Sequence, residues 1–332
     1  MKMNFRRLIG DFLLMLPIGL IGFVYYIFAI VFFYPKTQSH QESFLSFFIF
    51  HILLFLLLWS FIQAVICKPG NSPRNWGFYQ SDSDTKKKRY CLVCHSFKPE
   101  RCHHCSTCDT CILGMDHHCP WINNCVGFFN RKIFILLLLY SLINGFFILF
   151  KLTGQVYSSL ELILSDSIQV SLIPHLYYIA VYFFLLILMI ILSRFTYFHI
   201  KLVLKNSTTV EMLDKEAENY SISPLWNWRQ VFGKNPWLWF LPVYLETGKP
   251  IGDGITWARP KAPFELKANS NSDHNQEASG SPYFESPLNI SNIVKSSSLN
   301  SSVEYSQDLN SMQYVKSDSG ASSPFILPRG KA

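Results

Sequence analysis

The chain has 332 residues, of which 49% are hydrophobic and only 15% are charged, whereas about 25% of a soluble domain is charged. The apolar residues are concentrated in four blocks, which argues against two soluble domains and indicates an integral membrane protein. The net charge is +7. Because the Lys and Arg excess lies beside the apolar blocks, it reports topology and lipid contact, and no nucleic-acid partner is expected.

Each apolar block is long enough to cross a hydrocarbon core of about 30 Å as a helix. The first block contains Pro17, is longer than the apolar part of a secretory signal and lacks a small-residue cleavage site, so we interpret it as an uncleaved span. The predicted fold is an all-α integral membrane protein with four transmembrane helices. These are predicted at residues 12–34, 44–66, 133–150 and 172–192.

Lys and Arg are distributed unevenly over the loops. Residues 1–11, the loop 68–132 and the chain from residue 194 onward hold 27 of the 29 basic side chains. The positive-inside rule makes that face cytosolic, so both termini and the loop 68–132 are predicted in the cytosol. In this reducing compartment thiols bind metal or act as nucleophiles and rarely form disulfides.

The region after the fourth span has two parts. Residues 194–257 are mixed polar and aromatic and hold five of the eight tryptophans, which indicates contact with the membrane interface. Residues 263–332 are rich in Ser and Asn and have no apolar periodicity, which predicts a disordered tail. No internal repeat is evident in the chain.

Eight of the nine cysteines and five of the ten histidines lie between residues 91 and 125. Cys-x2-Cys pairs are typical of zinc knuckles, and two tetrahedral zinc ions need eight ligands. Six cysteines and two histidines would complete two such sites, which leaves Cys67, Cys102 and Cys119 as surplus thiols. A surplus thiol flanked by histidine is a candidate nucleophile. The six ligand cysteines are Cys91, Cys94, Cys105, Cys108, Cys111 and Cys125.

Two other interpretations are open at this point. The run from Cys102 to Cys111 is close to an iron–sulfur pattern, but it lacks the x3 gap and the following proline, and the interspersed histidines favour zinc. A purely structural zinc module in the membrane, such as a ligase or an adaptor, would leave Asp116-His117-His118-Cys119 without a role.

The stretch from Cys91 to Phe134 resembles the cysteine-rich domain of the DHHC family of protein S-acyltransferases (palmitoyltransferases), including its small fungal members. Thr208-Thr209-Val210-Glu211 matches the family's TTxE motif, and residues 227–233 resemble its C-terminal aromatic segment. The chain departs from the family at Lys68, where an Asp is usual, and by the added Cys102. The shared residues are Lys98-Pro99-x-Arg101-x2-His104-Cys105 and Asp116-His117-His118-Cys119-Pro120-Trp121-Ile122-x-Asn124-Cys125-Val126-Gly127-x2-Asn130-x3-Phe134.

The resemblance implies a ligand set for each of two structural zinc ions. One is Cys91, Cys94, His104 and Cys111, and the other is Cys105, Cys108, His118 and Cys125. It further implies that Cys119 is the nucleophile, with His117 as its base, Asp116 orienting His117, and Thr209 as a hydrogen-bond partner of Asp116.

The implied reaction is ping-pong transfer of a palmitoyl or other long-chain acyl group. Cys119 would take the group from acyl-CoA and pass it to cytosolic cysteines of membrane-associated proteins. Arg89, Lys98 and Arg101 are candidate contacts for the CoA phosphates. His199 is expected to be structural or interfacial. An internal membrane is expected, the vacuole first and otherwise the Golgi or endoplasmic reticulum. The alternative function is a catalytically idle zinc scaffold, whose role would survive replacement of Cys119.

Overall fold

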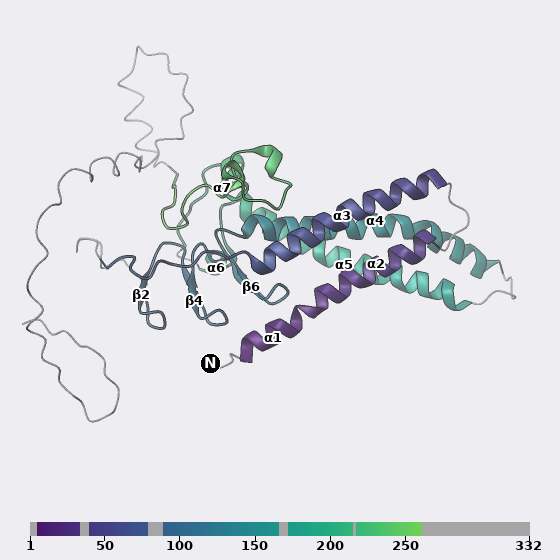
Figure 1. Cartoon of the computed structure of the whole chain (residues 1–332), viewed down its shortest axis with the longest axis horizontal. Helices are drawn as coiled ribbons and strands as arrows, with labels where there is room; N and C mark the ends of the chain where they lie inside the picture. The colour runs from purple at the N-terminus through teal and green to yellow at the C-terminus, as the bar shows by residue number, and fades with distance from the viewer. Residues whose placement is uncertain (1–4, 34–39, 79–88, 166–171, 215–216, 261–332) are drawn as a thin grey trace, which may run out of the picture. The chain divides into compact units, whose positions relative to one another are not determined.

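The computed structural model describes residues 5–33, 40–78, 89–165, 172–214 and 217–260, so the predicted tail 263–332 lies outside the described part of the chain. Four helical segments are long and apolar enough to cross a membrane, which confirms the predicted four-span helical fold. A cysteine-rich region separates the second span from the third (Figure 1). The candidate spans are Ile9–Ala29, Phe44–Ile66, Arg131–Leu164 and Leu172–Leu204.

The first span is formed by two helices, α1 (Phe5–Leu13) and α2 (Met15–Phe33). The helix is interrupted at Leu14, three residues before Pro17. Pro17 accounts for the interruption, because its ring clashes with the carbonyl of residue 13 and it offers no N–H to that carbonyl. The first residues of α2 line the cavity described below, together with residues of the cysteine-rich region.

The other spans are α3 (His40–Ile66), α4 (Arg131–Leu164) and α5 (Leu172–Leu204), and α4 is central because it contacts α2, α3 and α5. The buried Asn144 joins two of them, since its Nδ2 donates to the carbonyl of Leu53 on α3 at 3.1 Å. α4 and α5 extend beyond the apolar segments predicted at 133–150 and 172–192, because helical hydrogen bonding continues into their more polar ends. At 34 residues, α4 is about 51 Å long and exceeds the hydrocarbon thickness.

The cysteine-rich region consists of three antiparallel hairpins of three-residue strands. They lie in a row beside the ends of the long helices (Figure 1). Their apolar cores consist mainly of cysteines, so little hydrophobic burial holds them together. The strands are β1 (Arg89–Cys91) with β2 (Ser96–Lys98), β3 (His103–Cys105) with β4 (Thr110–Ile112), and β5 (His117–Cys119) with β6 (Asn124–Val126).

These hairpins form an internal repeat of 14 residues, which corrects the sequence-based expectation that the chain has none. The first strands begin at Arg89, His103 and His117, and the pairing registers are the same in all three. Each turn ends in a residue with positive φ, at positions 95, 109 and 123. The repeat escaped detection because the structure preserves backbone geometry and ligand positions, whereas most of the other side chains differ.

The chain after α5 forms two short helices, α6 (Thr209–Leu213) and α7 (Pro224–Phe232), and two 3-10 turns, η2 (Pro236–Leu238) and η3 (Glu246–Gly248). Two side chains of α4 bind this segment's backbone. The fully buried Lys132 donates to the carbonyls of Leu238, Val243 and Gly248 at 2.8, 3.0 and 3.4 Å, and the Tyr140 hydroxyl donates to the carbonyl of Phe240.

The segment 236–245 therefore runs alongside the first turns of a membrane-spanning helix. Lys132 and Tyr140 are eight residues apart on α4, which is about 12 Å along the helix axis. The segment has no charged residue, and the side chains of Trp237 and Phe240 are 87% and 64% exposed. Trp237 and Phe240 thus point away from the protein, whereas Trp239 and Tyr244 of the same segment pack against its core.

Candidate active site and metal sites

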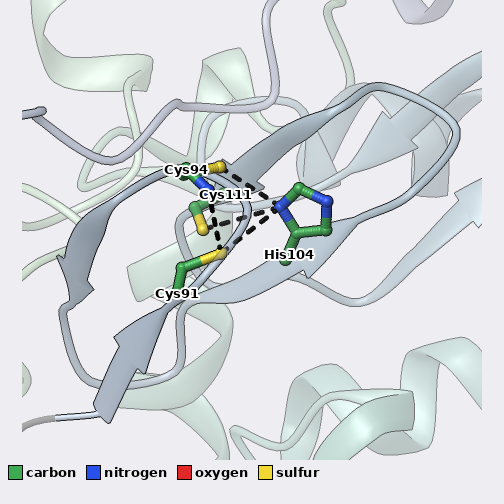
Figure 2. Close-up of side chains that lie close together, drawn as sticks. All are labelled: Cys91, Cys94, His104 and Cys111. Carbon is green, nitrogen blue, oxygen red and sulfur yellow. Dashed lines mark hydrogen bonds between the residues drawn. The ribbon is translucent and has the colours of Figure 1, made fainter. Parts of the chain in front are cut away.

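Two clusters of three cysteines and one histidine could each bind a metal ion. In the first, which Figure 2 shows, Nδ1 of His104 faces the sulfurs of Cys94, Cys91 and Cys111 at 3.2, 3.6 and 4.0 Å. Ligand atoms about 2.0–2.3 Å from a tetrahedral zinc lie at similar separations from one another. The donors therefore fit a four-coordinate ion.

The second cluster repeats this geometry one hairpin further along. Nδ1 of His118 lies 3.5, 3.6 and 3.7 Å from the sulfurs of Cys108, Cys125 and Cys105. These two groups are the ligand sets that the resemblance implies. Both lie in closed surroundings and supply four protein ligands, which is the pattern of structural metal sites.

The 14-residue repeat explains how the two ligand sets are shared among three hairpins. The first strand and turn of each of the first two hairpins supply two cysteines, and the paired strands of the next hairpin supply a histidine and a cysteine, as in His104 opposite Cys111. In the third hairpin the position of the second turn cysteine is occupied by Ile122, which is buried. Cys119 therefore has the position of a turn ligand without a partner thiol, and its sulfur stays outside both metal clusters.

Cys119 is adjacent to a histidine–carboxylate pair. Nδ1 of His117 lies 2.7 Å from Oδ2 of Asp116. Because an ionised carboxylate only accepts, Nδ1 carries the proton, and Nε2 is left to interact with the thiol. Asp116 is completely buried, and Cys119 is 4% exposed. The strand pairing of β5 with β6 fixes both His117 and Cys119.

The surroundings shift the pKa values of this pair in opposite directions. Burial alone would raise the pKa of Asp116, but the charge of Arg131 and the hydrogen bond from His117 lower it to about 2. Burial alone would lower the pKa of His117, but hydrogen bonds with Asp116 and Cys119 raise it to about 9. The imidazolium form of His117 is therefore favoured beside an ionised carboxylate.

Asp116 is held by residues from three distant parts of the chain. The backbone N–H of Thr209 donates to Oδ1 at 3.1 Å, and the Thr209 hydroxyl donates to the Asp116 carbonyl. Nη2 of Arg131, at the start of α4, lies 3.4 Å from Oδ1, and Nδ1 of His199, on α5, lies 3.6 Å from Oδ2. Thr209 thus lies where the resemblance implies.

Arg131 was not among the predicted site residues, and His199 was expected to be structural or interfacial. His199 lies beyond the predicted fourth span 172–192, so no local signal marked it, and only the longer α5 places it within a span beside Asp116. Arg131 had no such signal either, because it follows a motif at the end of a polar loop, and only the packing of α4 brings it to Asp116.

The three basic candidates for CoA binding lie in different environments. Arg89 is exposed and donates to the carbonyls of Pro99 and Cys102, both at 3.2 Å, and Lys98 is half-buried. Arg101 is 4% exposed, and its guanidinium makes a bidentate pair with Glu211 at 2.5 and 2.7 Å. Arg101 therefore connects the cysteine-rich region to the TTxE motif.

A cavity of about 480 Å³ extends from Cys119 between the long helices. Its walls are almost entirely apolar and come from all four spans. The arrangement of a thiol at the end of an apolar cavity fits a reactive acyl chain better than a polar substrate. Side chains along α4 that line it are Phe134, Leu137, Leu138, Ser141, Asn144 and Gly145.

A membrane-embedded thiol acyltransferase is the class that this fold and site define. The profile of the family described as DHHC palmitoyltransferase matches residues 84–216. Over 275 residues the chain is 34% identical to probable protein S-acyltransferase 13 of Arabidopsis thaliana, covering 73% of this chain and 88% of that protein. It is 30% identical to human palmitoyltransferase ZDHHC2 over 274 residues, 72% of each chain. The chain belongs to the DHHC palmitoyltransferase family, and its activity is protein S-acylation.

Proposed function

We propose that Cys119 carries the acyl group between acyl-CoA and the protein substrate. The thiolate attacks the thioester carbonyl, the bond from that carbon to the CoA sulfur breaks, and CoA leaves as its thiol with a proton from His117. A thiolate of the substrate protein then attacks the acyl-Cys119 thioester and releases Cys119. The observation that carries this proposal is the position of Cys119, next to His117 and at the end of an apolar cavity.

In this cycle His117 holds the proton of Cys119 as an imidazolium beside the thiolate and gives it to the leaving CoA sulfur. Asp116 holds the imidazole in the tautomer that presents Nε2 to the thiol and stabilises the imidazolium. Thr209 holds Asp116 through its N–H and its hydroxyl. The hydrogen bonds from His117 to Asp116 and from Thr209 to Asp116 support these roles.

We assign zinc to the two metal sites. Thiolates with one imidazole in tetrahedral surroundings favour zinc over magnesium or calcium, which prefer oxygen ligands. Since the hairpins have little apolar core, the ions would hold the strands that position His117 and Cys119.

Arg89 and Lys98 are the proposed partners of the CoA phosphates, because both side chains reach the surface of the first hairpin. Arg101 is reassigned from CoA binding to a structural role, because its donors are directed to Glu211 and Asn206. Exchanging Arg89 or Lys98 for Gln should raise the KM for palmitoyl-CoA and leave the zinc content unchanged.

The proposed topology has both termini and the cysteine-rich region in the cytosol, where membrane-associated substrate proteins expose their cysteines. It rests on the positions of the basic residues. An internal membrane is proposed as the location, the vacuole first and the Golgi or endoplasmic reticulum next, on the resemblance to small fungal members. Protease protection and microscopy of a tagged chain test topology and location separately.

Acyl loading of the purified protein tests the central proposal. Zinc-loaded protein is incubated with labelled palmitoyl-CoA, run on a denaturing gel and treated with neutral hydroxylamine. We expect label that hydroxylamine removes, that is absent from Cys119→Ser and that is reduced in His117→Ala. Cys67→Ser is the matched control and should load normally. If folded wild-type protein takes no label, the acyl-enzyme proposal is wrong, and the idle-scaffold alternative replaces it.

A further inference from the structure

Among the described residues, four ionised side chains are buried near the start of β5, which Asp116 directly precedes. Asp116 and Glu211 are negative, and Arg101 and Arg131 are positive. Their exposed side-chain fractions are all 10% or less. Because the attraction between opposite charges is strong where water is excluded, the pairing within this group decides where each carboxylate points.

The guanidinium of Arg101 pairs with Glu211 and not with Asp116. Besides the bidentate pair, Arg101 donates to the side chain and the carbonyl of Asn206, both at 2.9 Å. Its guanidinium also lies 4.1 Å from the ring centre of Trp257. Arg131 is therefore the arginine that balances the charge of Asp116.

Arg131 contacts two parts of the site with one nitrogen. Its Nη2 lies 3.4 Å from Oδ1 of Asp116 and donates to the carbonyl of Ser207 at 2.6 Å. Ser207 is two residues before Thr209, whose N–H donates to the same Oδ1. Arg131 thus attracts one oxygen of Asp116 and holds the loop that binds it, while Oδ2 stays directed at His117.

We propose that Arg131 is a positioning residue for acyl transfer, which fixes the Asp116 carboxylate in the orientation that aligns His117 with Cys119. The inference rests on the proposed role of Cys119. Arg131 moves no proton and touches no substrate. It acts because a buried carboxylate held on Oδ1 by a cation and an N–H cannot rotate away from the imidazole. The charge and the two N–H groups on Nη2 are the features required.

The test is the single-turnover rate of acyl loading from palmitoyl-CoA. We expect Arg131→Gln to lower the rate constant by about 100-fold, the size of effect that small misplacement of a reacting group produces. The concentration of palmitoyl-CoA at half-saturation should stay within about twofold, because Arg131 contacts Asp116 and Ser207, whereas the proposed CoA partner Arg89 contacts Pro99 and Cys102. Arg131→Lys keeps the charge and should load within about fivefold of wild type. The control Arg259→Gln removes an exposed arginine that pairs with Glu100 and Glu218, and it should load normally.

A double-mutant cycle separates positioning from a general loss of structure. If Arg131 acts through Asp116, Arg131→Gln should change loading less than about twofold in an Asp116→Asn background, although it is severe alone. Normal loading by Arg131→Gln, effects that multiply, or an Arg131→Lys variant as slow as Asp116→Asn would each overturn the proposal. If Arg131→Gln does not fold with two zinc ions, the Arg131→Lys result decides.

Failure of the proposed function gives a different result. If the wild-type protein takes no acyl label, the acyl-enzyme proposal is refuted. The effect of Arg131 on Cys119 can still be measured as the rate at which iodoacetamide alkylates Cys119, followed by mass spectrometry. Arg131→Gln should slow that alkylation while the zinc content is unchanged. Equal alkylation rates in wild type and Arg131→Gln would overturn the proposal without reference to acyl-CoA.

Discussion

The length of the apolar cavity predicts which acyl chains the enzyme loads. α4 lines the cavity from Phe134, whose ring lies 5.2 Å from that of His117, to Gly145, a distance of 11 residues or about 16 Å of helix. A chain with carbon–carbon bonds of about 1.5 Å advances about 1.3 Å per carbon when extended. About 13 carbons therefore reach the level of Gly145, and about eight reach Ser141.

Replacing Ser141 by Phe should shift the preference of loading from palmitoyl toward decanoyl chains. The larger side chain would displace the outer methylenes of a long acyl group from the cavity. Palmitoyl would lose about five of the carbons that fit and decanoyl about two, a difference of about three methylenes at about 0.8 kcal/mol each, which is about 2.4 kcal/mol or about 60-fold in relative rate. The palmitoyl-to-decanoyl ratio should therefore fall about 60-fold.

A competition assay measures this ratio directly. Zinc-loaded protein receives equimolar palmitoyl-CoA and decanoyl-CoA below their aggregation concentrations, and mass spectrometry identifies the acyl group on Cys119. Ile143→Phe is the control, because Ile143 is 45% exposed and does not line the cavity. If Ser141→Phe slows both chains equally, or leaves the ratio unchanged, the cavity is not the acyl site.

Four further results are expected. Hydrogen bonds with Asp116 and Cys119 outweigh burial and raise the pKa of His117 to about 9. Loading should therefore change little between about pH 7 and 8.5 in wild type, but rise with pH in His117→Ala, where hydroxide must remove the thiol proton. A wild-type profile as steep as the variant's would contradict this. Metal removal by a strong chelator should abolish loading and expose the hairpins to protease, since their cores consist mainly of cysteines; full activity at zero bound zinc would refute it. Ile122→Cys should complete a third cysteine pair with Cys119, so that cadmium blocks loading and a weak chelator that leaves both four-ligand sites filled restores it. Equal cadmium sensitivity in wild type would argue against the repeat. In nanodiscs, brominated lipids should quench less tryptophan fluorescence in Trp237→Phe than in wild type, because Trp237 points outward beside α4. Trp226→Phe is the control. Equal quenching of wild type and Trp237→Phe would place the segment 236–245 away from lipid.

The features that sequence could predict are those that a short stretch of chain determines. Four apolar segments define the spans by composition alone. The metal ligands are also local, because a Cys-x2-Cys turn brings two sulfurs together wherever it occurs, as in Cys105 and Cys108. The surplus thiol of Cys119 follows from the same count of ligands. Motif spacing therefore predicts the cysteine pairs, whereas the histidines and the division into two ligand sets were expected from the family resemblance.

The features that sequence could not predict depend on packing between distant segments. Arg131 and His199 reach Asp116 only when α4 and α5 are assembled, and Thr209 was expected there through the family resemblance alone. Arg101 was expected to contact CoA because its charge is opposite to that of the CoA phosphates. Its burial against Glu211, 110 residues later, follows from tertiary structure that no local pattern encodes.

The origin of the groups around Asp116 has a consequence for how the enzyme is made. The last ligand of the second metal cluster is Cys125, and Thr209 follows 84 residues later. At about 5–20 residues per second, the ribosome needs several seconds to bridge that interval. During that time the hairpins can already bind metal and bring His117 to Asp116, but Asp116 lacks the hydrogen bonds from Thr209 and the contact with His199. Full activity toward neighbouring proteins is therefore expected only after the last helix has been inserted and the chain beyond it has folded against the hairpins.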